Sequence, residues 1–151
     1  MHPDLKLISD ELEKSPIPVQ LRFALKCVEE VESNLEDDTA IAALEKFRNL
    51  ITSQAEDVEK QLQELAKQLN SLASSHQGSK SIDGTRHAAV SATYALARAA
   101  NQKPVDAAAY AAYSVVYGYG GYAVNDPDAF AEVHHRQLNY LKTLKSGLAL
   151  Q

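Results

Sequence analysis

The residues best suited to bind a ligand or a partner are aromatic and lie in the second half of the chain. Tyr110, Tyr113 and Tyr117 recur at helical spacing, and Tyr94 belongs to the preceding helical segment. Tyrosine is common in ligand pockets and protein interfaces, but it also fills cores when its hydroxyl finds a polar partner. We favour a tyrosine-rich core. The alternative is an open pocket for a small molecule, lined by Tyr94, Tyr110, Tyr113, Tyr117 and His87.

The histidines raise the question of a metal site. Glu132 and His135 form the Glu-x-x-His step from which carboxylate-bridged di-iron bundles build half a site. Such a site needs a second copy of this step and two further glutamates, and the sequence has no second copy. We therefore expect no metal and no cofactor, and we interpret His134 and His135 as surface residues near a glutamate.

Patterns for other kinds of catalysis are weak. Cys27 lies on an apolar helical face, which favours a buried structural thiol over a reactive one. The glycine-rich segment 118–121 lacks the strand-loop-helix context of a nucleotide-binding loop. Adjacent acids such as Asp37 and Asp38 are typical of helix caps and solvated faces. We predict that the protein is not an enzyme.

Negative charge is concentrated in the first half of the chain. Residues 1–75 contain fifteen Asp and Glu against eight Lys and Arg, and residues 76–151 contain five against seven, which gives the net charge of −5. Because phosphate contact needs clustered Lys and Arg, we expect no nucleic-acid binding. Such a surface favours a basic protein partner. The predicted contact residues are Glu29, Glu30, Glu32, Glu36, Asp37 and Asp38.

The whole chain shows helical periodicity. Amphipathic patterns cover residues 4–14, 18–35, 37–51, 58–72, 85–100, 104–122 and 127–145. Ser53 and Glu56 have the spacing of a capping box, which could start the fourth helix or lie in a bend. Residues 74–84 predict a flexible loop. We expect one all-α domain over residues 1–151, a compact bundle of six to seven helices. The predicted inward stripe of the third helix is Ala40, Ile41, Leu44, Phe47 and Ile51.

A regular leucine seam marks the fourth helix. Its apolar residues alternate four- and three-residue steps over about two heptads, as in a coiled coil. A stand-alone coiled coil needs three or four heptads, so we favour an antiparallel helical hairpin inside the domain. The alternative is a structural homodimer, if the seam is exposed in the monomer. The seam consists of Val58, Leu62, Leu65, Leu69 and Leu72.

We expect the protein to be cytoplasmic and not to enter a membrane. The first residues lack a basic region followed by an apolar run, so they do not resemble a signal peptide. No window approaches the roughly 18 apolar residues that a membrane span requires. One cysteine excludes an internal disulfide, in keeping with a reducing compartment.

The alanine-rich segments also carry a family resemblance. Ala88-Ala89, the run from Ala107 to Tyr113 and the amphipathic helix that follows resemble the all-helical immunity proteins of bacterial toxin systems. The helix through residues 21–27, its acidic break and the next helix through residues 42–44 have the same layout, so the resemblance covers about residues 19–144. It implies a non-enzymatic inhibitor that binds a cognate toxin. The acidic first half would then contact a basic toxin by complementary charge.

Overall fold

The computed structural model describes residues 2–53, 56–75 and 85–149, and all regular structure within them is helical. Two short 3₁₀ helices, η1 (Glu32–Asn34) and η2 (Gly121–Asn125), interrupt the series of α-helices. The predicted all-α bundle is confirmed. The loop predicted at residues 74–84 falls, from residue 76 on, outside the described residues. The seven α-helices are α1 (Pro3–Glu13), α2 (Ile17–Glu30), α3 (Asp38–Thr52), α4 (Val58–Ser74), α5 (Thr85–Ala100), α6 (Pro104–Gly118) and α7 (Pro127–Ala149).

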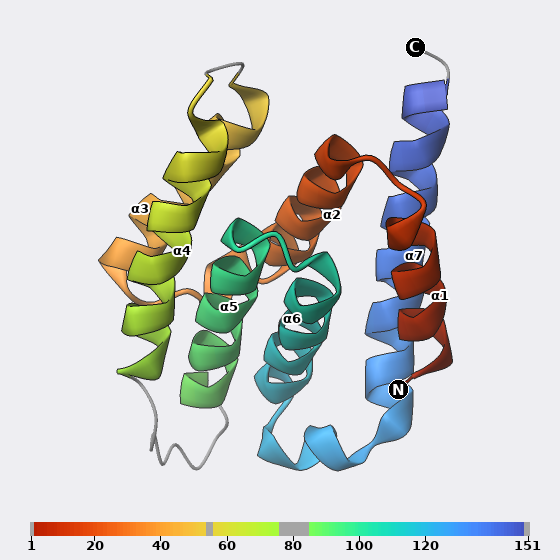
Figure 1. Cartoon of the computed structure of the whole chain (residues 1–151). Helices are drawn as coiled ribbons and strands as arrows, with labels where there is room; N and C mark the ends of the chain where they lie inside the picture. The colour runs from red at the N-terminus through yellow and green to blue at the C-terminus, as the bar shows by residue number, and fades with distance from the viewer. Residues whose placement is uncertain (1, 54–55, 76–84, 150–151) are drawn as a thin grey trace.

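The α5–α6 pair occupies the centre of the bundle (Figure 1). These two helices make the most extensive contact in the protein. Helix α4 packs beside α5, whereas α1 and α7 pack together beside α6. Helix α2 crosses behind both central helices, and α3 pairs antiparallel with α4. Because α2 covers one side of α5 and α6, solvent reaches these two helices on the side that faces away from α2.

Prolines and acidic caps determine where the helices begin. Proline occupies one of the first two helical positions in α1, α2 and α6, where its missing N–H costs nothing, and it also opens α7. Asp37 accepts a hydrogen bond from the backbone N–H of Thr39 at 2.9 Å, and Asp126 accepts one from that of Asp128 at 3.0 Å. These local signals explain why the predicted starts near residues 18, 38, 104 and 127 agree with the structure.

Helix ends were predicted less well. The second helix ends at Glu30 rather than near Leu35, because the chain turns into η1 after Val31, and both Val31 and Leu35 remain buried beyond the helix. The sixth helix ends at Gly118 rather than near residue 122, because Gly120 adopts a φ of 130° that stops helical geometry. In the second helix, the apolar stripe thus extends beyond the last helical residue, so the stripe alone overestimates the length of the helix.

One prediction about the third helix was also wrong. Ile41 is 47% exposed, because Ala43 and Leu44 take the inner side of α3 in its place. Ser53 is the C-cap of α3 and α4 begins at Val58, while residues 54–55 inside the Ser53–Glu56 spacing lie outside the described residues. Helical spacing alone did not distinguish the edge of the apolar face from its centre.

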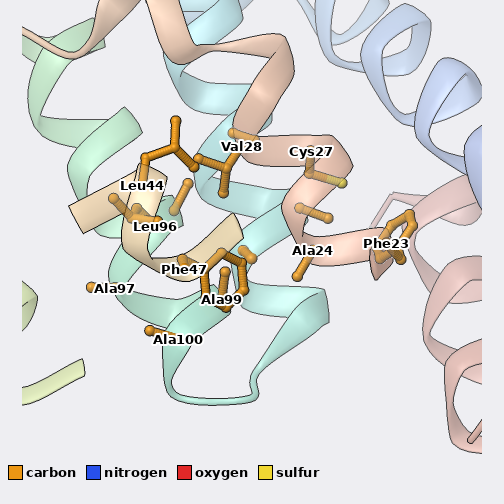
Figure 2. Packing of buried hydrophobic residues seen from close by; sticks show 14 of the residues in the cluster. Phe23, Ala24, Cys27, Val28, Leu44, Phe47, Leu96, Ala97, Ala99 and Ala100 are labelled. Carbon is orange, nitrogen blue, oxygen red and sulfur yellow. The ribbon is translucent and has the colours of Figure 1, made fainter. Parts of the chain in front are cut away.

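The main core takes buried side chains from all seven α-helices, and Figure 2 shows the part of it contributed by α2, α3 and α5. Phe23 and Val28 from α2, Leu44 and Phe47 from α3 and Leu96 from α5 are at most 1% exposed. Burying each such side chain contributes roughly 1.5–3 kcal/mol. The core is therefore large enough to hold the helices together without a metal or a disulfide.

Alanine allows α5 and α6 to approach each other closely. Helices separated by methyl groups pack near the short end of the usual interaxial range, about 8–10 Å. The turn between the helices places Gln102 at φ 58°, with hydrogen bonds from Gln102 N to Ala99 O at 3.1 Å and from Lys103 N to Arg98 O at 2.9 Å. This is a Schellman motif, in which glycine is the usual residue at the left-handed position. The buried alanines of the pair include Ala88, Ala92, Ala95, Ala99, Ala107, Ala108, Ala111 and Ala112.

Candidate functional site

Aromatic side chains gather on the solvent side of the α5–α6 pair. On both helices, the positions opposite the buried alanines share one face, which is only partly covered. We call this surface, together with the neighbouring ring from the start of α7, the tyrosine face. It consists of His87, Tyr94 and Arg98 on α5, Tyr110, Tyr113 and Tyr117 on α6, and Phe130 on α7.

One group of rings connects α5, α6 and α7. His87 stacks on Tyr117 with ring centres 5.0 Å apart, and Tyr113 lies 6.2 Å from Tyr117. Phe130 meets Tyr113 edge-on at 5.1 Å. Such aromatic pairs each contribute about 0.5–1.5 kcal/mol beyond their buried area. The contacts therefore fix the rings in place while their outer sides stay accessible.

A second group of rings lies toward the α5–α6 turn. Tyr94 and Tyr110 are stacked with centres 5.1 Å apart. The guanidinium carbon of Arg98 lies 5.8 Å from the centre of the Tyr110 ring, within the range of a cation–π interaction. The Nε atom of Arg98 is buried and has no hydrogen-bond partner.

The interpretation of these tyrosines as core residues was wrong for Tyr113, whereas Tyr110 packs against the main core from its edge. Tyr94, Tyr110 and Tyr117 are only partly buried, and Tyr113 is 45% exposed. Small alanines occupy the inner faces of α5 and α6, and the rings lie at the outer edge of the pair. The structure does bring the predicted pocket residues together, as stacked rings on a surface. Phe130 was missed as a member, although the Asp126-Pro127 start signal places it in the first turn of α7.

The acidic residues predicted to contact a partner lie around the end of α2 and the start of α3, and most have partners inside the chain. Arg48 pairs with Glu29 at 3.1 Å and with Glu32 at 2.6 Å. It also pairs with Glu45 at 2.6 Å, so three carboxylates surround one guanidinium and the cluster remains negative. Asp37 caps α3, as described above. Glu36 and Asp38 are exposed.

Glu30 belongs to a separate cluster between α2 and α7. Its carboxylate accepts hydrogen bonds from Arg136 Nη2 at 2.7 Å and from the Tyr140 hydroxyl at 2.7 Å. Burial and then the Glu30 hydrogen bond raise the pKa of Tyr140 to about 12. The hydrogen bond to Glu30 also raises the pKa of Arg136, with a smaller contribution from Tyr119. Glu30 therefore joins two helices, and neither Arg136 nor Tyr140 was singled out from the sequence.

Two surface hollows lie side by side between α3 and α4. Their volumes are about 600 and 380 Å³, and both are lined by Ala42 and Lys46. Glu45, which also binds Arg48, lines the larger hollow, and Asp38 lines the smaller one. The acidic residues of α3 thus border a concave surface.

The histidines of α7 have different surroundings, which corrects their assignment to the surface. His135 is exposed, but His134 is 4% exposed and lies under the His2 ring, with ring centres 5.2 Å apart. Gln137, fully buried, donates to Ala108 O at 2.9 Å and contacts His134 Nδ1 at 2.8 Å, so neutral His134 carries its proton on Nδ1. Burial lowers the pKa of His134. Among the described residues, no three His, Cys, Asp or Glu lie close enough to hold a metal.

Cys27 and the leucine seam are parts of the core. Cys27 is fully buried, as predicted, and burial raises the pKa of its thiol far above the ordinary value. Thiolate chemistry is therefore unfavourable there. Leu62, Leu65 and Leu69 are at most 2% exposed, while Val58 and Leu72 pack partly buried against the same core. The exposed seam that a homodimer would need is thus already covered within the monomer.

None of the helices in the described segments is long and apolar enough to cross a membrane. Comparison with protein-family models, with curated proteins and with solved structures found no match for the chain. The case for a function therefore rests on the surfaces described above.

Proposed function

We propose that this chain is a non-catalytic protein-binding domain that acts as an immunity-type inhibitor of a bacterial toxin. The order of alanine-rich helices and the acidic first half support this proposal, since they resemble the layout of such inhibitors. The tyrosine face is the principal contact surface. The acids around α3 are a second contact region, suited to a basic protein segment.

One observation carries the proposal: Tyr113 is 45% exposed although its ring is held between Tyr117 and Phe130. Tyrosine is enriched at interface hot spots, where a large ring fills a pocket of the partner. Tyrosine also has few rotatable bonds, and a ring that is already fixed loses little further freedom on binding. Tyr113 is therefore a preorganised anchor.

The acidic region adds negative charge and concavity. Glu36 and Asp38 are exposed, and Asp38 lines the smaller α3–α4 hollow. A basic partner segment would be attracted to this region, mainly through a faster association rate that falls as salt increases. Glu30 is less suited to this role, because its carboxylate is engaged by Arg136 and Tyr140.

The test is capture of partners from an extract of the native cells at moderate salt, followed by mass spectrometry and by two matched variants. Tyr113→Ala removes the anchor, whereas Tyr119→Ala removes a tyrosine that is 52% exposed outside the tyrosine face. We expect Tyr113→Ala to reduce recovery of one stoichiometric partner at least tenfold and Tyr119→Ala to leave it unchanged. Equal recovery with both variants would refute the tyrosine face as the contact surface.

Two further measurements test the remaining parts of the proposal. Glu36→Gln combined with Asp38→Asn should weaken capture more at low salt than at high salt, because exposed charges are screened. Expression of the captured partner alone in a host should slow growth, and co-expression of this chain should restore it. A partner without such an effect on growth would rule out the inhibitor role and leave only the binding function.

A further inference from the structure

Arg98 differs from the other partly buried arginines whose side chains the structure describes. Arg48 and Arg136, which are also partly buried, each pair with at least one glutamate. Arg98 makes no ion pair with any acid in the part of the chain that the structure describes, and its Nε is buried without an acceptor. A buried polar group left without a partner costs about 1–3 kcal/mol. The protein therefore holds a cation in place and leaves its charge uncompensated.

The surroundings of Arg98 determine how it could be used. Its guanidinium lies 5.8 Å from the centre of the Tyr110 ring, and Tyr110 is stacked on Tyr94. The cation–π contact orients the planar group at the surface, so a ligand would meet a fixed fork of donors rather than a flexible chain. Of the nitrogens in this side chain, Nε alone is both buried and unpaired. The Nη atoms are therefore the first donors that an incoming acceptor meets.

We propose that Arg98 binds a carboxylate, supplied by an Asp or Glu side chain of the protein that docks on the tyrosine face. A carboxylate matches the guanidinium in shape, since its two oxygens accept two parallel N–H bonds. One guanidinium balances one negative charge, so a singly charged group fits better than a dianionic phosphate.

This inference rests on the proposed function, and it specifies that the partner presents a carboxylate to Arg98. From Tyr110 to Tyr117, the ring row spans seven residues of helix, or about 10 Å at 1.5 Å per residue. The partner segment would place an acidic residue against Arg98 and an apolar residue on Tyr113, within that distance.

The first test uses the full chain and benzoate, which combines a carboxylate with a ring. The nitrogen–hydrogen NMR signal of Arg98 Nε should shift saturably as benzoate is added, and benzyl alcohol, with the same ring but no charge, should not produce this shift. Benzoate binding should weaken at least tenfold in Arg98→Gln and several-fold in Arg98→Lys, which keeps the charge but loses the fork. Arg22→Gln, at an exposed arginine of α2, is the matched control and should bind as the wild type does. A linear response, or an equal loss in Arg22→Gln, would overturn the carboxylate site.

The second test asks whether the partner supplies the carboxylate. In the capture experiment, Arg98→Gln should reduce recovery of the partner at least tenfold, and Arg22→Gln should not. Retention of the partner by Arg98→Gln, when Tyr113→Ala loses it, would overturn the inference but not the proposed function. If Tyr113→Ala also retains the partner, the proposed contact surface itself has failed. Benzoate reports on Arg98 without any partner, so the two failures are distinguishable.

Discussion

Glu30 was predicted to contact a partner, but its contacts with α7 indicate that it stabilises the fold, and a stability measurement can distinguish the two roles. Its side chain is 16% exposed and accepts hydrogen bonds from Arg136 and Tyr140 on α7. Arg136 is 36% exposed, so its ion pair is screened and contributes at most about 1 kcal/mol. The Tyr140 hydroxyl bound to a carboxylate adds about 1.5 kcal/mol. We therefore expect Glu30→Ala to lower the free energy of unfolding by about 1.5–2.5 kcal/mol.

The measurement is urea unfolding of three variants beside the wild type. Glu36→Ala is the control, because Glu36 is exposed, and we expect a change below about 0.5 kcal/mol. Glu30→Gln keeps an oxygen acceptor but removes the charge, and its free energy of unfolding should fall by about 1 kcal/mol. The difference between Glu30→Gln and Glu30→Ala then gives the contribution of the hydrogen bonds. In thermal unfolding, the loss in Glu30→Ala corresponds to about 5–10 °C.

The reasoning would be refuted if Glu30→Ala and Glu36→Ala differed by less than about 0.5 kcal/mol. That result would mean that the Glu30 contacts contribute nothing net to the joint between α2 and α7. If the expected loss is found, a binding defect in Glu30 variants has to be corrected for the unfolded fraction. Glu36 and Asp38, which are exposed, are then the acids with which to test contact with a basic partner.

Three further predictions concern the turn and the titrating groups. Gln102→Gly should stabilise the protein by about 0.5–1 kcal/mol in urea unfolding, because Gln102 has a φ of 58°, and Gln102→Ala should give no such gain. The pKa of His134 is lowered by burial, so below about pH 6.5 the unfolded chain binds more protons and stability falls as pH drops, by at most about 1.4 kcal/mol per pH unit. His134→Asn should flatten this dependence and His135→Asn should not. Tyr140 has a pKa of about 12, so stability should decline as pH rises from about 10 to 12, and a Tyr140→Phe variant that keeps the whole decline would contradict the prediction.

The helix pattern could be predicted because its signals are local. Asp37, Asp126 and the prolines act on backbone groups within a turn of themselves, so reading the sequence in order is sufficient. The buried state of Cys27 followed from the apolar stripe of its own helix. These features depend on neighbours in sequence, and the structure confirms them.

The polar network around His134 could not be predicted, because it depends on contacts between distant segments. His134 is covered by His2 at the other end of the chain, and Gln137 reaches the carbonyl of Ala108 on α6. Nothing near His134 in the sequence shows that α1 will pack over it. The same holds for Glu30, whose partners Arg136 and Tyr140 come from the last helix.

The position of the tyrosines shows how size decides between two apolar stripes on one helix. Helix α6 has an alanine stripe, which includes Ala108 and Ala111, and a tyrosine stripe, which includes Tyr110 and Tyr113. Periodicity identifies both stripes but does not say which one is buried. The alanine stripe is buried because it lets α5 and α6 pack closely, and the rings are left on the outer side. The preference for a tyrosine core failed for Tyr113, which is 45% exposed.

This arrangement also bears on function. Burying a large side chain fully contributes roughly 1.5–3 kcal/mol, so stability alone would favour rings inside and methyl groups outside. The α5–α6 pair has the reverse order over several turns, and Tyr113, its most exposed ring, is fixed by contacts on two sides. Single exposed aromatics are ordinary, whereas a contiguous and fixed set beside an uncompensated arginine is typical of a recognition surface. The stability that the rings forgo in the free protein would be recovered when a partner covers them.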